Sequence, residues 1–210
     1  YAAGFDGPWG WDFGGASNLD ELFTRISSFF LRRLKKDVLK FLPPKTFTNI
    51  PLELSEAEYR EYKKVEKGIV EQINAETGET TETLTHHLAN IHKLKMFTSK
   101  IKVNNAIEMI QDIIDADEKV VVFSQYVDIA NKIKEHFGDT AVIFTGKNNI
   151  TEKQAAVDGF QKNNKIKIFS GTIGAAGVGI TLTAASKLIF VDSAWSPSDM
   201  EQASDRIHRA

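Results

Sequence analysis

The sequence predicts an α/β protein, in which a parallel sheet flanked by helices follows an all-helical insertion. From Lys119 onward, short unbroken apolar runs rich in Val, Ile and Phe alternate with helical segments. Such runs are typical of strands buried on both faces of a parallel sheet. Before Lys119, apolar residues instead recur at helical spacing over most of residues 19–116, which indicates helices that each bury one face.

The part before the sheet begins with a segment rich in glycine and aromatic residues. Residues 1–18 predict an irregular packed loop. Asn18 is expected to cap a helix over residues 19–42, which the pair Pro43-Pro44 ends. A short strand is expected at 46–54, and Ser55 with Glu58 forms a capping-box pattern before a helix at 56–75. After a break at 77–83, a second helix is expected at 84–116.

The last third reads as a βαβαβ series with right-handed crossovers. Its four apolar runs occupy residues 119–124, 140–145, 165–170 and 187–192. Helices are expected at 127–137 and 151–163, and a short helix within a Gly- and Ala-rich stretch fills the third gap. The chain therefore divides into residues 1–45, 46–118 and 119–210. Function in such sheets gathers at the carboxyl ends of the strands.

Composition narrows the class of protein. The 210 residues are 42% hydrophobic, and 26 Lys and Arg face 28 Asp and Glu, so a polyanion would have to bind a local basic patch. The absence of cysteine excludes disulfides, thiolate zinc sites and a cysteine nucleophile. Without a long apolar run or a signal-type start, we expect no membrane partner and an intracellular location, in the cytoplasm or nucleoid if bacterial or viral and in the nucleus if eukaryotic. The start without Met and the abrupt end lead us to expect a fragment of a longer protein.

Small hydroxyl and glycine residues follow the predicted strands. Backbone N–H groups, hydroxyls and a lysine at successive strand ends can bind phosphate oxygens. The alternative is that Ser, Thr and Gly serve only as turn and N-cap residues. The candidates for contact with a polyanion are Ser124, Thr145, Gly146, Lys147 and Thr172.

The stretch at 170–186 carries glycines at 171, 174, 177 and 179, which would allow close backbone approach to a ligand. It contains no G-x-G-x-x-G pattern, and a tight helix–sheet packing loop is the alternative. A P-loop is also absent, because Asn148 follows Gly146-Lys147. No strand ends in two adjacent carboxylates suited to Mg²⁺. Any nucleotide would therefore be bound mainly by another domain.

Arg206 and Arg209 lie three positions apart on the last expected helix, so both guanidinium groups can reach one point. Two fixed cations favour an anion such as phosphate, and pairing with surface carboxylates is the alternative.

Two further clusters, one of histidines and one of basic residues, stand out in the first half of the chain. The histidines at 86, 87 and 92 lack the i, i+4 spacing of a metal pair, so we predict solvated side chains and no metal site. A run of basic residues extends from Arg32 to Lys45, the last residue of LPPK. It is either a solvated helix face or a surface that contacts the DNA backbone or a neighbouring domain. Its members are Arg32, Arg33, Lys35, Lys36, Lys40 and Lys45.

Four ordered segments carry a resemblance: RRLKKDVLKFLPPK (32–45), KVVVFSQY (119–126), AAGVGITLTAA (175–185) and WSPSDMEQASDRIHRA (195–210). They resemble the second half of the ATPase motor of the Swi/Snf family, within helicase superfamily two. The last segment is similar to the family's sixth motif. The beginning, PWGWDFGGASNLDEL (8–22), resembles the branch that contains the annealing helicases. Ser196 and Lys153 depart from the family's usual Asn and Arg.

The resemblance implies a RecA-like second lobe with a helical protrusion, in a motor that clamps ATP and Mg²⁺ between two lobes and moves along double-stranded or forked DNA independently of its sequence. The first lobe would hold most of the nucleotide. Arg206 and Arg209 would be arginine fingers, and other residues would bind nucleotide (Gly177, Gly179, Gln202, Asp205) or DNA (Ser124, Thr145, Gly146, Lys147, Thr172, Arg32, Arg33). The alternative is a non-catalytic ATPase-like lobe that binds DNA or protein.

Overall fold

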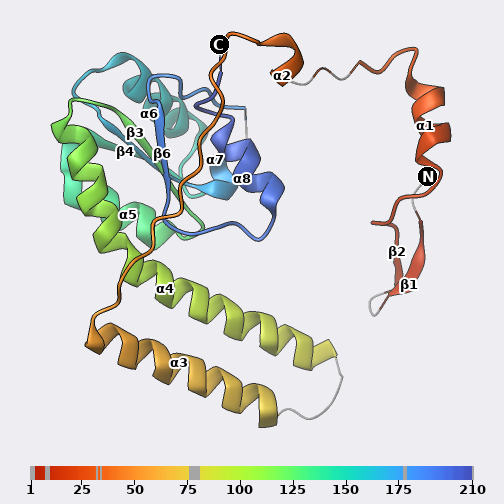
Figure 1. The fold of residues 1–210 in the computed structure, drawn as a ribbon, viewed down its shortest axis with the longest axis horizontal. Coiled ribbons are helices and arrows are strands. Elements are labelled where there is room, and N and C mark those ends of the chain that lie inside the picture. Colours follow the sequence, from red (N-terminus) through yellow and green to blue (C-terminus); the bar gives the residue numbers. More distant parts are fainter. Residues whose placement is uncertain are drawn as a thin grey trace.

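The computed structural model describes residues 3–7, 10–31, 33, 35–75, 81–176 and 179–209. Figure 1 shows three parts: an N-terminal arm (residues 3–42), a hairpin of two long helices, and a C-terminal lobe built on a sheet. None of the helices in these described ranges is both long and apolar enough to cross a bilayer.

The lobe contains a four-stranded parallel sheet, as the apolar runs predict. Its strands are β3 (Val120–Ser124), β4 (Ala141–Phe144), β5 (Ile168–Thr172) and β6 (Lys187–Phe190), in the order β4-β5-β3-β6. Strand β5 begins three residues later than expected, because a turn delays it: Lys165 N–H donates to Asn163 Oδ1 and Ile166 N–H to the Asn163 carbonyl. The strand then continues to Thr172, which pairs with Ser124.

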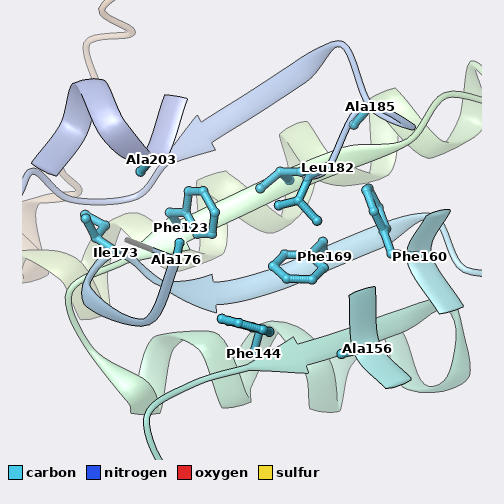
Figure 2. Close-up of a cluster of buried hydrophobic side chains, with 11 residues drawn as sticks. Phe123, Phe144, Ala156, Phe160, Phe169, Ile173, Ala176, Leu182, Ala185 and Ala203 are labelled. Atoms are coloured by element: carbon cyan, nitrogen blue, oxygen red, sulfur yellow. The ribbon is translucent and has the colours of Figure 1, made fainter. Parts of the chain in front are cut away.

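Helices cover both faces of this sheet, which explains why the apolar runs do not alternate. The helices of the lobe are α5 (Val127–Phe137), α6 (Ile150–Lys162), α7 (Ile173–Ala176) and α8 (Pro197–Ser204). On one face, Phe123, Phe144 and Phe169 pack with Phe160 of α6 and with small residues of α7 and α8 (Figure 2). On the other face, Val120, Val122 and Ile168 pack against α5 and the long helix α4.

The helical hairpin consists of α3 (Glu56–Ala75) and α4 (Thr81–Asp115). The capping box at the start of α3 is confirmed, because Glu58 N–H donates to Ser55 Oγ and Ser55 N–H donates to Glu58 Oε2. The C-terminal half of α4 belongs to the core of the lobe through Val103 and Ile110, both fully buried. The domain limits 46–118 and 119–210 stay a prediction. The C-terminal half of α4 lies before residue 119 and yet packs in the core of the lobe.

The N-terminal arm differs from expectation. Residues 5–7 and 10–12 are not irregular: β1 (Phe5–Gly7) and β2 (Gly10–Asp12) pair in antiparallel fashion, and Gly10 has a φ of 104°. The single helix expected at 19–42 is wrong too, because the described residues of that range form two short helices, α1 (Leu19–Ile26) and α2 (Lys35–Val38). Helix α1 buries none of its side chains. A helical pattern without a packing partner supports only a short helix.

The strand expected at 46–54 is also absent: residues 43–55, all described, form no helix or strand. This segment runs past the sheet towards α3 (Figure 1). A groove of about 1530 Å³ is lined on one side by residues 42–54 and on the other by residues 183–193 and part of α4. The segment forms no ladder of backbone hydrogen bonds with the edge strand β6. Without such a partner, an extended segment does not become a β-strand.

Glycine at position 171 is required by the close approach of two strands. A Cβ there would lie 2.8 Å from the carbonyl oxygen of Phe144 and 3.4 Å from the ring of Phe123. We expect Gly171→Ala to lower the free energy of unfolding by about 1–3 kcal/mol, measured by urea denaturation. Gly68→Ala in α3 is the control, because a Cβ at Gly68 meets nothing within 4 Å. Its stability should stay the same or rise by up to about 1 kcal/mol, and equal midpoints for the two variants would contradict this account.

Candidate functional site

The carboxyl ends of the four parallel strands meet at one edge of the sheet, where the sequence predicted the site. Strands β3 and β5 end side by side, with Ser124 and Thr172 paired in the same register. Strand β4 ends at Phe144 on the other side of β5, followed by Thr145. The predicted strand-end residues are therefore neighbours in space.

The Ser124 hydroxyl at this edge is buried and hydrogen-bonded within the protein. Ser124 is 1% exposed, and its Oγ donates to Asp192 Oδ2 at 2.6 Å. Asp192 Oδ1 also accepts from the backbone N–H of Gln125 at 2.7 Å. Burial, together with the charge of Asp192, raises the pKa of the neighbouring Tyr126 hydroxyl. Asp192 thus joins the ends of β6 and β3.

Thr145 shapes the loop after β4. Thr145 is 2% exposed, and both its N–H and its Oγ1 donate to Asn148 Oδ1, at 2.8 and 2.9 Å. Gly146 and Lys147 at the tip of the same loop are exposed. Of the five strand-end candidates, these two are open to solvent, whereas Ser124, Thr145 and Thr172 are buried.

The glycine-rich connection, residues 173–186, leaves the same edge after β5. It starts with α7 and reaches Gly179, which is exposed with a φ of 42° and so suits glycine. Gly177 lies outside the described residues. Gln161 of α6 braces the end of the connection, since its Nε2 donates to the Thr181 carbonyl and its Oε1 accepts from Ala184 N–H.

The two candidate arginines do not lie on the last helix, which corrects the expectation of a shared helix face. Helix α8 ends at Ser204, and the following residues 205–209, here called the arginine turn, leave the helix. The chain leaves the helix in a tighter turn, in which Arg206 N–H donates to the Ala203 carbonyl at 3.1 Å, and the Arg206 carbonyl accepts from Leu182 N–H at 2.8 Å. Figure 1 shows α7 and α8 side by side, which places the turn next to the connection.

Both arginines nevertheless bond to the same connection. Arg206 is 9% exposed and its Nε donates to the Ala176 carbonyl at 3.0 Å. Arg209 donates from its guanidinium to Thr181 Oγ1 at 2.9 Å. Burial lowers the pKa of Arg206, and the nearby charge of Arg209 adds to this, while Asp205 acts in the opposite direction. The two cations are therefore close neighbours at one place.

The remaining candidates are more scattered. Gln202 is exposed on α8, and the Asp205 carboxylate pairs with Lys45. Arg33 is exposed in the N-terminal arm, which Figure 1 shows extending away from the lobe. Arg32 lies outside the described residues. The structure thus brings Asp205 together with the arginines and separates them from Arg33.

Sequence reasoning missed several contacts at this edge. Lys95 of α4 lies 4.2 Å from the ring centroid of Trp195 and donates to the Ser193 carbonyl, and His92 packs edge-on against Tyr126. No local pattern pairs residues so far apart in the chain. The capping box of α6, Asn149 with Glu152, was visible as N-x-x-E and could have been found.

Metal ligands do not gather here. Within the described ranges, no group of three or more His, Cys, Asp or Glu side chains could hold a metal ion. The side chains of residues 86 and 87 lie outside that description, and His92 contacts Tyr126.

Comparison with known proteins agrees with this geometry. Residues 102–210, including the sheet and the arginine turn, match the helicase conserved C-terminal domain. Residues 12–106 match the SNF2-related domain. The lobe is therefore a helicase C-terminal domain with a RecA-like fold. The chain as a whole belongs to the SNF2-related helicase family.

Several relatives and solved structures are similar over most of this chain. It is 30% identical to an uncharacterized ATP-dependent helicase of Mycoplasma pneumoniae, over 90% of this chain and 19% of that protein. It is 32% identical to the human DNA annealing helicase and endonuclease ZRANB3, over 95% of this chain and 18% of that protein. The Sulfolobus solfataricus SWI2/SNF2 ATPase core in complex with dsDNA is 27% identical, with a TM-score of 0.65 over 93% of this chain and 45% of that chain. The chain spans about a fifth of these curated relatives.

Asp192 should be important for the stability of this edge. Asp192→Ala leaves the Ser124 hydroxyl and the Gln125 N–H without their acceptor, and we expect a loss of about 1–3 kcal/mol of unfolding free energy. Asp192→Asn, which keeps one acceptor oxygen, should lose less. Asp199→Ala, at an exposed position of α8, is the control. Urea denaturation measures all three, and a loss in the control equal to that in Asp192→Ala would overturn this assignment.

Proposed function

We propose that this chain is the C-terminal motor lobe of a Swi/Snf-type ATP-dependent DNA translocase, of the remodelling or annealing-helicase kind. One observation carries the proposal: Arg206 and Arg209 both bond to the connection that leaves the carboxyl edge after β5. Two permanent cations at the edge where α/β sheets bind their ligands suit a polyphosphate. Family membership and the relatives named as ATP-dependent helicases support it.

In this proposal the two arginines act as arginine fingers on ATP. Phosphoryl transfer spreads negative charge over the γ-phosphoryl oxygens, and a fixed guanidinium stabilises that charge in the transition state. Arg206 is held by burial and by the Ala176 carbonyl, and Arg209 by Thr181. Gln202 and Asp205, with Gly177 and Gly179, are proposed to contact or position the nucleotide.

Most of the nucleotide contacts are assigned to a companion lobe. The described residues contain no carboxylate cluster suited to Mg²⁺, and the nearest buried carboxylate, Asp192, is occupied by Ser124 and Gln125. They therefore do not fit a magnesium site, and no step at the metal is assigned to this lobe. We propose that the companion lobe binds Mg²⁺ and the phosphates.

The N-terminal arm offers a surface for that companion lobe. Its large apolar side chains are well exposed, including Trp11 at 68%, Phe23 at 64% and Phe29 at 78%. So many exposed large apolar side chains on one segment suit an interaction with another surface. Docking on the first lobe would bury the arm and would place the basic run around Arg32 and Arg33 between the lobes.

DNA is the proposed track, bound independently of sequence. Gly146 and Lys147 are exposed at the carboxyl edge and can contact phosphates directly. Ser124, Thr145 and Thr172 are proposed to act through the loops whose shape they fix. Contacts of this kind would make binding salt-dependent. One relative of known structure is an SWI2/SNF2 core in complex with dsDNA.

The arginines test this function in the complete protein in which the chain occurs. Arg206→Ala or Arg209→Ala should lower DNA-stimulated ATP hydrolysis by about 10³-fold or more, with DNA affinity within about twofold of the parent. Arg206→Lys keeps the charge of the buried group and should still be strongly impaired, because lysine lacks the planar fork. Arg60→Ala on the exposed face of α3 is the matched control. A parent protein without any ATPase activity would instead favour a non-catalytic lobe that binds DNA or protein.

The chain by itself should not hydrolyse ATP. It lacks a P-loop, and the described residues offer no magnesium site, so both halves of the phosphate-binding machinery would be missing. Phosphate release by the purified 210-residue chain, with and without DNA, measures this. Robust magnesium-dependent hydrolysis that Arg206→Ala abolishes would contradict the prediction.

A further inference from the structure

The arginine turn is bonded to a segment that lies far away in the sequence. Lys45 Nζ donates to Ser204 Oγ at 2.8 Å and forms an ion pair with Asp205. The two residues of each contact are 159 and 160 positions apart. The Lys45 and Asp205 side chains are 23% and 32% exposed, so this ion pair is partly shielded from water and is worth more than a surface pair.

A second bond ties the same segment to the other end of the turn. His208 Nε2 donates to the carbonyl of Pro43 at 2.7 Å. Pro43 and Pro44 restrict the backbone between the two bonds, because proline fixes φ and limits the residue before it. Pro43–Lys45 therefore contacts the turn on both sides of Arg206, at Ser204–Asp205 and at His208.

The charge of Lys45 also matters for the arginines. Asp205 lies close enough to Arg206 to influence its pKa. A carboxylate beside a guanidinium weakens the field that the guanidinium can direct at an anion. Lys45 compensates this carboxylate, so the turn with its partner presents three cations against one anion. The ammonium group thus holds the turn and offsets the charge that Asp205 places beside the arginines.

We propose that Lys45 is a positioning residue for Arg206 and Arg209, required for turnover and not for nucleotide or DNA binding. This inference rests on the proposed function of the two arginines. Lys45 acts through the side chains of Ser204 and Asp205, to which it is bonded. It also connects the arginine turn to the N-terminal arm, because the chain continues directly from Lys45 through Pro43 into residues 3–42.

The first test uses the chain itself. In ¹⁵N-labelled protein, Arg206 Nε–H should give a protected signal, since it is buried and bonded to the Ala176 carbonyl. Lys45→Met keeps the length of the side chain and removes its charge, and should shift or broaden the Nε–H signals of Arg206 and Arg209. Lys45→Arg should restore them. Lys187→Met, which breaks an exposed ion pair with Glu118, is the matched control. Unchanged arginine signals in Lys45→Met would overturn the proposal.

The second test measures ATP hydrolysis in the complete protein. Lys45→Met should lower kcat by about 10- to 100-fold, the cost of misplacing a catalytic group by about 1 Å, and should leave KM for ATP and DNA affinity within about twofold. Lys45→Arg should recover most of kcat. If Lys45 had only a structural role, Lys45→Met would lower the unfolding midpoint and raise KM together with the loss of kcat. Lys45→Arg would then not restore kcat separately from stability.

The two proposals fail in different ways. If Arg206→Ala and Arg209→Ala leave hydrolysis intact, the finger role is wrong. If these variants abolish hydrolysis while Lys45→Met behaves like Lys187→Met, only the positioning role is wrong.

Discussion

The shared carboxyl edge of the parallel sheet is the constraint on which the candidate site depends. Strand β5 pairs in parallel with both β3 and β4, so the chain leaves the same edge after Ser124, Phe144 and Thr172. Two apolar cores on opposite faces fix this register, because a slip of one residue would exchange Ile168 and Phe169 between them. The arginine turn takes its place from this edge, since both arginines bond to the connection that begins there.

Burial of Arg206 has a physical consequence for any anion that approaches it. Removing a guanidinium from water is unfavourable, which is why its pKa falls. A bond from Nε to the Ala176 carbonyl offsets part of this cost and fixes the plane of the group. A fixed cation need not reorganise when charge develops nearby, whereas a solvated one must first shed water. The more exposed Arg209 depends on Thr181 for the same purpose, and Thr181 lies in the segment that Gln161 braces.

The sequence was informative where local pattern and tertiary packing agree. Unbroken apolar runs predicted all four strands, and Ser55 with Glu58 predicted the start of α3, because burial and capping act at short range. The helix at 19–42 failed because apolar side chains such as Phe23 stay exposed, and the strand at 46–54 failed because that segment pairs with no neighbouring strand. Arg206 and Arg209 were predicted as a pair, but the bond between the Arg206 carbonyl and Leu182 N–H, and the ion pair of Asp205 with Lys45, depend on residues that only folding brings together.

Helix α4 joins the helical hairpin to the functional edge. Its 35 residues form one continuous helix, whose C-terminal half is buried in the lobe through Val103 and Ile110. Nearer its N-terminal end, Lys95 contacts Ser193 and Trp195 in the loop after β6, and His92 contacts Tyr126 after β3. A helix held at both places cannot tilt as a rigid rod unless one set of contacts breaks. The hairpin and the strand-end loops are therefore joined through α4, by the contacts of Lys95 with Ser193 and Trp195 and of His92 with Tyr126.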